Sequence, residues 1–135
     1  MQNLGRHFTS DGEPWLTINP NYQKINVAET VQRKDSVFYY YQKLIELCQK
    51  YDIITNGEYQ LDAQEDEQIF AFRRVGQKET LLVVTNFSDH EKTYRLSEDL
   101  KHYSGKLLIN NYDRKTDLHD ELQIKPYEAI VYLLS

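Results

Sequence analysis

The sequence predicts a mainly β protein, an antiparallel β-sandwich preceded by a long loop and one or two helices. From residue 57 onward, apolar residues recur with a period of two in short runs, and turn-like segments separate the runs. No helical pattern intervenes between the runs, which is typical of an antiparallel sandwich or barrel. Before residue 54, a segment rich in Gly, Pro, Asn and Ser leads into one amphipathic stretch. The chain therefore changes character near residue 54.

The first 25 residues show no stable hydrophobic period. The stretches DGEPW and NPNY are typical of turns, because proline fixes φ and asparagine or glycine adopts unusual backbone angles. A loop of this length in a small domain is usually functional or belongs to something larger. The residues that follow, 26–34, are predicted to form a short helix that begins after Asn26.

A second helix is predicted over residues 36–51, with Ser36 as its N-cap. At about 100° per residue, the apolar side chains share one broad face, formed by Val37, Tyr40, Tyr41, Leu44, Ile45, Leu47, Cys48 and Tyr51. Tyr39 falls among the polar side chains. Such a broad face indicates packing against a substantial partner surface. We therefore expect Tyr40 and Tyr41 to be buried packing residues and not a sugar-binding platform.

Seven short strands are predicted in the rest of the chain, over residues 57–62, 68–75, 79–87, 91–96, 105–111, 120–124 and 128–134. The segments between them, such as RVGQKE and NFSDHE, are turn-like. The stretch TLLVVTNF is apolar throughout its middle, as expected of a strand that is covered on both faces. The stretch EAIVYLL near residue 135 has the same character.

Composition excludes several classes of function. The chain has 135 residues, 40% of them hydrophobic and 13% aromatic, which predicts one packed domain, with or without an extension. A net charge of −5 argues against a nucleic acid or an anionic membrane as a partner, since both need a basic surface. The sequence shows no apolar run of membrane-spanning length and no signal-peptide pattern. Cys48 is the single cysteine, which fits a reducing compartment, and we expect the cytoplasm.

Spacing alone assigns no residue to catalysis, a cofactor or a metal. The histidines are far apart in sequence and are interpreted as surface or loop residues: His7, His90, His102 and His119. The five glycines are scattered and form no phosphate-binding loop. An acidic cluster lacks the ligand pattern of a calcium-binding EF-hand loop, so a solvated turn between strands is favoured; it contains Asp62, Glu65, Asp66 and Glu67.

Other side chains have both a functional and a structural interpretation. Cys48 lies at the edge of the apolar helix face without a neighbouring base, which favours a buried, inert thiol over a nucleophile. Trp15 lies in the loop, where it either stacks on a sugar or fills a gap against the core, and the second is favoured. The strand region offers further rings for sugar contacts, although several alternate with apolar residues and are expected to face inward: Tyr59, Tyr94, Tyr103, Tyr112, Tyr127 and Tyr132.

Five motifs follow one another in a specific order: PWLTINPNYQKINVAE, DSVFYYYQKLIELCQKYDIITNGEYQLD, IFAFRRVGQKETLLVVTNFSD, LLINNYD and IKPYEAIVYLL. In this order and spacing they resemble the carboxyl-terminal part of α-glucosidases of the α-amylase superfamily. The resemblance extends from Gly12 to the last residue. It is greatest to the group of oligo-1,6-glucosidases, dextran glucosidases and trehalose-6-phosphate hydrolases.

The resemblance implies a division into two parts. Residues 1–53 would be the end of a catalytic (β/α)₈ barrel, with its rim loop and last helix, and residues 54–135 would be the terminal antiparallel β-sandwich. The family hydrolyses α-glucosidic bonds with retention, through an Asp nucleophile, a Glu acid/base and a second Asp. All three lie in barrel strands upstream of the matching segment, so the resemblance assigns no catalytic residue here.

Two classes of function follow from this comparison. The first is the C-terminal part of an intracellular α-glucosidase acting on α-1,6- or related bonds, which is inactive alone, needs no cofactor and meets oligosaccharide only through the barrel. In this interpretation the chain is an excised domain, a truncated reading frame or a degenerate remnant. The alternative is a stand-alone carbohydrate-binding β-sandwich. In addition, the apolar helix face is expected to drive homodimer formation if nothing covers it.

Overall fold

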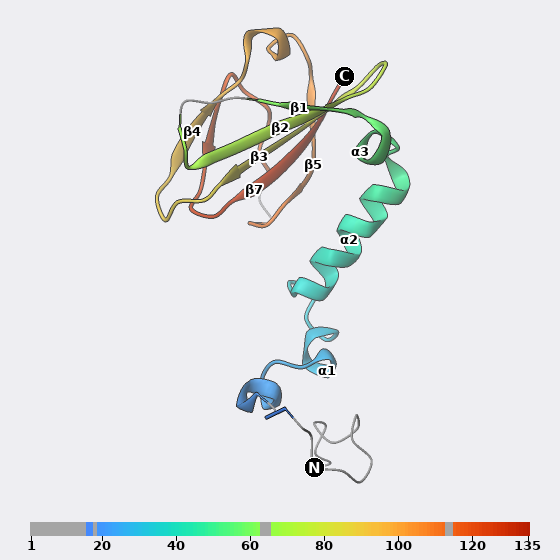
Figure 1. The fold of residues 1–135 in the computed structure, drawn as a ribbon, viewed down its shortest axis with the longest axis vertical. Helices are drawn as coiled ribbons and strands as arrows, with labels where there is room; N and C mark the ends of the chain where they lie inside the picture. Colours follow the sequence, from blue (N-terminus) through green and yellow to red (C-terminus); the bar gives the residue numbers. More distant parts are fainter. Residues whose placement is uncertain (1–15, 18, 63–65, 113–114) are drawn as a thin grey trace. The chain divides into compact units, whose positions relative to one another are not determined.

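The computed structural model describes residues 16–17, 19–62, 66–112 and 115–135 (Figure 1). The chain forms two compact units, Met1–Leu44 and Ile45–Ser135. The predictions for His7 and Trp15 lie outside the described residues, as does that for Glu65. Within the described part of the chain, no helix is long and apolar enough to cross a membrane.

The described part of the first unit contains short helical elements capped by asparagine side chains. The 3₁₀-helix η2 spans Pro20–Gln23 and the helix α1 spans Val27–Thr30. Asn26 is the N-cap of α1, as predicted, and its Oδ1 accepts from the backbone N of Glu29 at 2.9 Å. This α-helix ends four residues before the predicted residue 34 and continues only as turns.

Helix α2 spans Val37–Lys50 and belongs to both units, and it agrees with the predicted helix to within one residue at each end. Ser36 precedes it, and its carbonyl accepts from the backbone N of Tyr40 at 3.1 Å. The Ser36 hydroxyl donates to the carbonyl of Thr30 at 2.8 Å. This side chain therefore ties the start of α2 to the end of α1.

No residue of α2 is buried in this chain, so the packing of its apolar face against a partner surface stays a prediction. Tyr40 is half-buried and Tyr41 is 63% exposed, whereas Tyr39, expected on the polar side, is half-buried and donates its hydroxyl to the carbonyl of Val31 at 2.9 Å. Cys48 is also exposed, contrary to the prediction. Helical spacing shows which side chains share a face but does not show what covers that face.

The second unit contains the seven predicted strands, each end within one residue of the expected position. They are β1 (Glu58–Leu61), β2 (Ile69–Val75), β3 (Thr80–Asn86), β4 (Lys92–Arg95), β5 (Gly105–Asn110), β6 (Glu121–Ile124) and β7 (Ala129–Leu134). Two short elements were not predicted, the helix α3 (Ile53–Asn56) and the 3₁₀-helix η3 (Glu98–Leu100).

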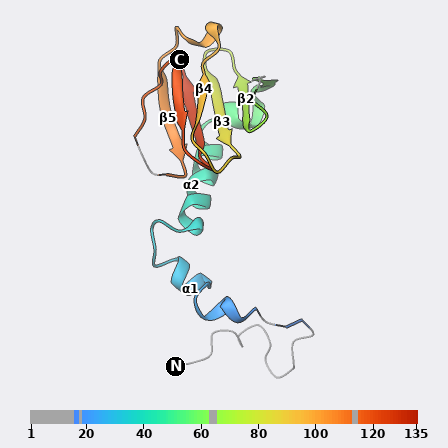
Figure 2. The same ribbon diagram turned by 90° about the vertical axis from the view of Figure 1, so that its left-hand side faces the viewer.

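The strands form two antiparallel sheets, as the sandwich prediction requires. One sheet has five strands in the order β1-β2-β3-β7-β5, and the other consists of β4 and β6. Figures 1 and 2 show β2, β3 and β5 in one layer. All pairings are antiparallel, and β5 has a register shift against β7 between Leu107 and Ile109.

The main core combines side chains from both sheets. Its buried members are Ile69, Ala71, Leu82, Val84, Tyr94, Leu96, Leu100, Leu122, Ile124, Ile130, Tyr132 and Leu134. Because successive strand residues point to opposite faces, their neighbours in β2, β3 and β7 point to the outer face of the five-stranded sheet. Burial of these apolar side chains supplies the main favourable term in folding.

A second apolar cluster covers part of that outer face. Ile53, Leu81, Leu108 and Leu133 are buried in it, and Leu47, Tyr51, Ile54, Val83 and Val131 pack around them. This explains the apolar middle of β3, where Leu81 and Leu82 are both buried although they point to opposite faces. The prediction that this strand is covered on both faces is confirmed at this position.

Candidate functional site

Two of the histidines that the structure describes, His90 and His102, have different neighbours. His90 lies beside Asp89, with Nδ1 at 2.7 Å from Oδ1, and both side chains are exposed. The ring of His102 lies 4.3 Å from that of Tyr103, centroid to centroid. Among the residues that the structure describes, no group of three or more His, Cys, Asp or Glu side chains is placed to hold a metal ion.

The acidic cluster is not simply a solvated turn, because Asp62 is buried with only 6% of its surface exposed. Asp66 is half-buried and contacts Lys92, whose Nζ lies 3.0 Å from its Oδ2. Hydrogen bonds from the backbone of Gln68 and from Lys92 lower the pKa of Asp66. Glu67 is exposed, as expected. The turn prediction fails for Asp62, because its partners come from distant parts of the chain.

Asp62 is the centre of a polar network in the second unit. Its Oδ1 accepts from the hydroxyl of Ser97 at 2.9 Å and from the guanidinium of Arg73 at 3.2 Å, and its Oδ2 accepts from the hydroxyl of Tyr94. Arg73 also donates to Ser97 at 3.1 Å and pairs with Asp99. We refer to these five residues as the Asp62 network.

The Asp62 network places one guanidinium, that of Arg73, between two acidic side chains, Asp62 and Asp99. Burial, reinforced by the hydrogen bond to Asp62, raises the pKa of Tyr94 well above its usual value, so this phenol stays protonated. Burial disfavours the charged form of Arg73, but Asp99 and Asp62 outweigh it and raise the pKa of the guanidinium. The hydrogen bond from Arg73 lowers the pKa of Asp99. Each carboxylate oxygen of Asp62 accepts at least one hydrogen bond from within the protein, so the network links distant parts of the sandwich.

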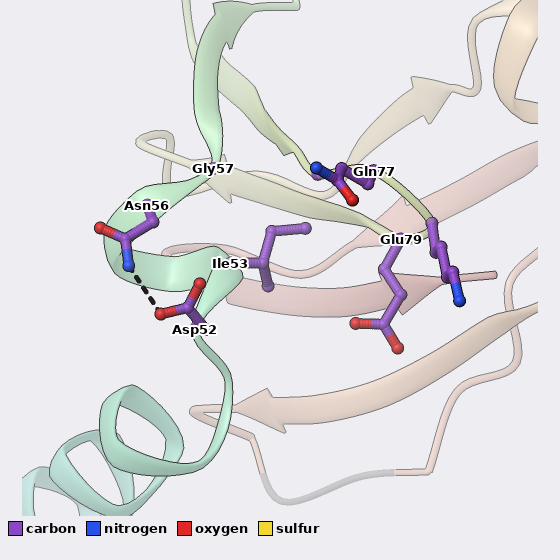
Figure 3. A pocket seen from close by; sticks show the side chains of 8 residues that line it. Asp52, Ile53, Asn56, Gly57, Gln77 and Glu79 are labelled. Carbon is purple, nitrogen blue, oxygen red and sulfur yellow. Dashed lines mark hydrogen bonds between the residues drawn. The ribbon is translucent and has the colours of Figure 1, made fainter.

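A cavity of about 530 Å³ lies between α3 and the turn that joins β2 to β3. Figure 3 shows Ile53 pointing from α3 toward this turn, with Asp52 and Glu79 on either side. Asn56 donates to Asp52 at 2.6 Å, so one of the acidic groups is already engaged. Gly57 and Gly76 form part of the wall. Among the described residues that line this cavity, none is aromatic.

The tyrosines of the sandwich divide into two groups. Tyr94 and Tyr132 are fully buried, as the alternation predicted, and Tyr103 packs against the core. The exposed members are Tyr59, Tyr112 and Tyr127, at 50%, 42% and 63%. Exposure alone therefore gives three rings on which a ligand or a partner can pack.

Tyr59 belongs to a larger apolar surface on the outer face of β1 and β2. Its strand partners place it beside Arg74, and Leu61 beside Phe72. The ring of Phe72 lies 5.4 Å from that of Tyr59 and 5.8 Å from that of Phe70. We call Tyr59, Leu61, Phe70 and Phe72 the aromatic face; Leu61 is 59% and Phe70 42% exposed.

Phe70 and Phe72 are not among the functional candidates that the sequence predicts. Their signal was present in IFAFRRV, where large apolar residues occupy both alternating sets of positions. Ile69 and Ala71 account for the core side of β2, so the two phenylalanines needed a second partner surface. By itself, the pattern predicts a strand and does not show which surface covers the two phenylalanines.

Two families match the chain in succession. Residues 3–57 match the catalytic domain of alpha amylases, and residues 69–131 match the C-terminal domain of the alpha-amylase SusG. The oligo-1,6-glucosidase of Bacillus cereus is 45% identical over 123 residues, which are 91% of this chain and 22% of that protein. The trehalose-6-phosphate hydrolase of Bacillus subtilis (strain 168) is 38% identical over 126 residues, 92% of this chain and 22% of that protein.

Solved structures show the same similarity. The crystal structure of the Bacillus licheniformis trehalose-6-phosphate hydrolase superposes with a TM-score of 0.84 at 39% identity, over 93% of this chain and 23% of that one. The isomaltulose synthase of Klebsiella sp. LX3 gives a TM-score of 0.85 at 32% identity, over 100% of this chain and 24% of that one. The chain thus spans about a fifth of the length of the curated relatives it matches.

Proposed function

We propose, from the premise that this chain belongs to the carboxyl-terminal part of the α-amylase-superfamily α-glucosidases, that it is the structural terminal segment of such an enzyme. The observation that carries the proposal is the order of the two family matches, catalytic domain and then C-terminal domain. In this proposal, residues 1–53 complete a catalytic barrel and residues 54–135 form the sandwich domain. The whole enzyme hydrolyses α-glucosidic bonds, as the names of the relatives suggest.

The catalytic carboxylates of this enzyme lie outside the chain. Retaining hydrolysis needs two carboxyl groups held about 5–5.5 Å apart across the scissile bond. Of the described residues, the two buried carboxylates are Asp62 and Glu128. Asp62 is held by its network, and Glu128 accepts from the backbone N of Lys125 at 2.8 Å. Neither lines the cavity beside α3, which supports a structural role for the segment.

The partner in this proposal is the catalytic barrel of the same enzyme, and oligosaccharide is bound only through that barrel. The enzyme works in the cytoplasm without a cofactor, and nucleic acid and membranes are not partners. A stand-alone carbohydrate-binding module is the second candidate, which the exposed rings of Tyr59, Tyr112 and Tyr127 favour. A homodimer through the exposed face of α2 is a further proposed assembly when the barrel is not present.

Complementation tests the proposed function. The Bacillus cereus oligo-1,6-glucosidase is produced without the carboxyl-terminal segment that this chain matches, and the 135-residue chain is co-expressed with it. We expect the chain alone to release no product from an aryl α-glucoside, and the mixture to give a soluble, active complex. The relative's own segment serves as the positive control. Hydrolysis by the chain alone that is lost on substituting its own Asp or Glu residues would contradict the proposal, as would the absence of any complex.

A further inference from the structure

We propose that the aromatic face of β1 and β2 is the surface on which the catalytic barrel of the same enzyme docks. This inference rests on the proposed function and adds to it the place of contact and the residues that make it. The contact would involve the exposed rings of Tyr59 and Phe70, with Leu61 and Phe72 beside them.

The two sheets differ in what they present outward. On β4 and β6 the outward side chains are polar and paired across the strands: Arg95 Nε lies 3.1 Å from Glu121 Oε1, and Thr93 donates to Gln123 at 3.0 Å. This is the composition of a sheet face in contact with water. The aromatic face has phenylalanine, tyrosine and leucine at the corresponding outward positions. An apolar surface of this kind on a folded domain marks a contact site.

One charged side chain lies beside the aromatic face. It belongs to Arg74, whose guanidinium donates to the carbonyl of Gly57 at 3.1 Å and lies 5.8 Å from the centroid of the Tyr59 ring. Phenylalanine rings offer no hydrogen-bond donor to sugar hydroxyls. The surface therefore fits an apolar protein partner better than an oligosaccharide.

The residues that pack on the neighbouring part of the same outer sheet face indicate which partner covers the aromatic face. Leu47, Tyr51, Ile53 and Ile54 belong to the segment that matches the catalytic domain, and they pack around Leu81 and Leu133 of the sandwich. The aromatic face continues directly from this contact, because Arg74 pairs with Leu81 and Phe72 with Val83. Catalytic-domain residues thus already cover one end of the face. The relatives are more than four times as long as their matching segments. We therefore infer that a further part of the catalytic domain covers the other end of this sheet face, where the aromatic face lies.

The test uses the complementation pair described above and the full chain with Phe70→Ser. Phe70 is 42% exposed, and its substitution removes contact area without emptying the core. The control is Tyr112→Ser, which is equally exposed at 42% but lies just beyond the end of β5, at the opposite edge of the sheet. A double variant, Tyr59→Ser with Phe70→Ser, extends the comparison. Thermal melts monitored by circular dichroism establish that each variant folds.

We expect Phe70→Ser to weaken the complex with the barrel about tenfold or more, as for a central interface residue, and the control to stay within about twofold. Equal effects of both variants would overturn the inference while leaving the proposed function intact, whereas no complex with the unaltered chain would overturn the proposed function. If Phe70→Ser leaves the barrel complex unchanged, the inference is also overturned. In that case, dissociation of dimers of the chain alone by Phe70→Ser would assign the face to a second copy. Loss of isomaltose binding in the same variant would assign the face to a sugar.

Discussion

At the residue scale, Asp62 shows how a buried carboxylate is tolerated in a small sandwich. Removing a carboxylate from water costs several kcal/mol unless other groups replace its hydrogen bonds. Here Arg73 supplies charge, and Tyr94 and Ser97 supply hydroxyl donors. The partners come from β2, from β4 and from the segment after β4, so the network joins both sheets. Loss of one donor therefore leaves part of a buried charge unsatisfied.

We predict that Tyr94→Phe lowers the free energy of unfolding by about 1–3 kcal/mol at pH 8, because Asp62 loses a buried donor. The sign of the pH dependence follows from the raised pKa of Tyr94. The stability that its protonated form contributes is complete below the unfolded pKa near 10, and decreases as the pH rises above it. The difference in free energy of unfolding between the unaltered chain and Tyr94→Phe should therefore become smaller between about pH 10 and 12. Urea titrations across this range measure it.

Tyr132→Phe is the matched control. Tyr132 is equally buried, but its hydroxyl donates to the neutral carbonyl of Thr116 at 3.0 Å. A neutral hydrogen bond contributes about 0.5–1.5 kcal/mol, so this loss should be the smaller one. Equal losses for the two variants, or a Tyr94→Phe effect that does not change with pH, would show that Asp62 does not depend on this phenol.

At the element scale, α3 packs closely on the sheet because glycines flank it. A Cβ at Gly57 would lie 2.6 Å from the carbonyl oxygen of Ile53 and 2.9 Å from the Cβ of Arg74. The backbone of Gly57 is ordinary, with φ at −63°, so the glycine is required by space and not by its dihedral angles. The closeness of this contact lets Ile53 reach Leu81 and Leu133 in the second apolar cluster.

We predict that Gly57→Ala lowers the free energy of unfolding by about 1–3 kcal/mol, the usual cost of forcing atoms into a packed site. Without a clash, alanine at a compatible backbone position would stabilise the protein by about 0.4–1 kcal/mol, because it lowers the conformational entropy of the unfolded chain. The clash at Gly57 therefore decides whether the substitution raises or lowers the free energy of unfolding. Gly76→Ala is the control, because its Cβ would lie 3.2 Å from its nearest neighbours, Glu79 O and Ile53 Cδ1. Denaturant titrations that show Gly57→Ala at or above the stability of Gly76→Ala would contradict this account.

One turn of the sandwich contains a conformation that is unusual for its residue. Tyr127 has φ at 54°, and it follows Pro126 in a turn that the backbone N of Glu128 closes on the carbonyl of Lys125 at 3.1 Å. Positive φ at this turn position normally favours glycine, and a tyrosine pays about 1–2 kcal/mol there. The buried Glu128 offsets part of this cost, because its carboxylate accepts from the backbone N of Lys125 within the same turn.

At the scale of the whole molecule, the chain exposes more large apolar side chains than its own folding requires. Along α2 they recur at helical spacing, with Val37, Phe38, Tyr41 and Ile45 exposed by 80%, 45%, 63% and 48%. Such a stripe is the apolar face of an amphipathic helix, and in proteins it is normally covered. The broad face expected from the sequence exists, but the chain by itself leaves it accessible.

We predict that the isolated chain self-associates at micromolar concentration and that Ile45→Lys shifts it toward the monomer. The added charge would have to be buried in an apolar contact, which is strongly unfavourable. Gln49→Lys on the same helix adds an equal charge at a polar, exposed position and should leave the association unchanged. Sedimentation velocity distinguishes these outcomes, and a monodisperse monomer for the unaltered chain would contradict the prediction.

The elements of the fold were largely predictable from the sequence, whereas the candidate contact surface was not. Alternation of side chains is a local property of a strand, so β2 and β3 were located to within one residue. The helix α3 was missed because four residues are too few to show a helical period. Phe70 and Phe72 were assigned to a strand, but only the register against β1 and β3 places them on one uncovered face.

By itself, the sequence determined the order of helix, strands and turns and the relationship to the α-glucosidase family, because periodicity and motif order are written along the chain. Only the tertiary structure decided burial: Asp62 is enclosed, Cys48 and Tyr41 are exposed, and the outer face of β1 and β2 is open. Burial depends on partners that are distant in sequence, such as Arg73 and Tyr94 for Asp62. No local pattern carries that information.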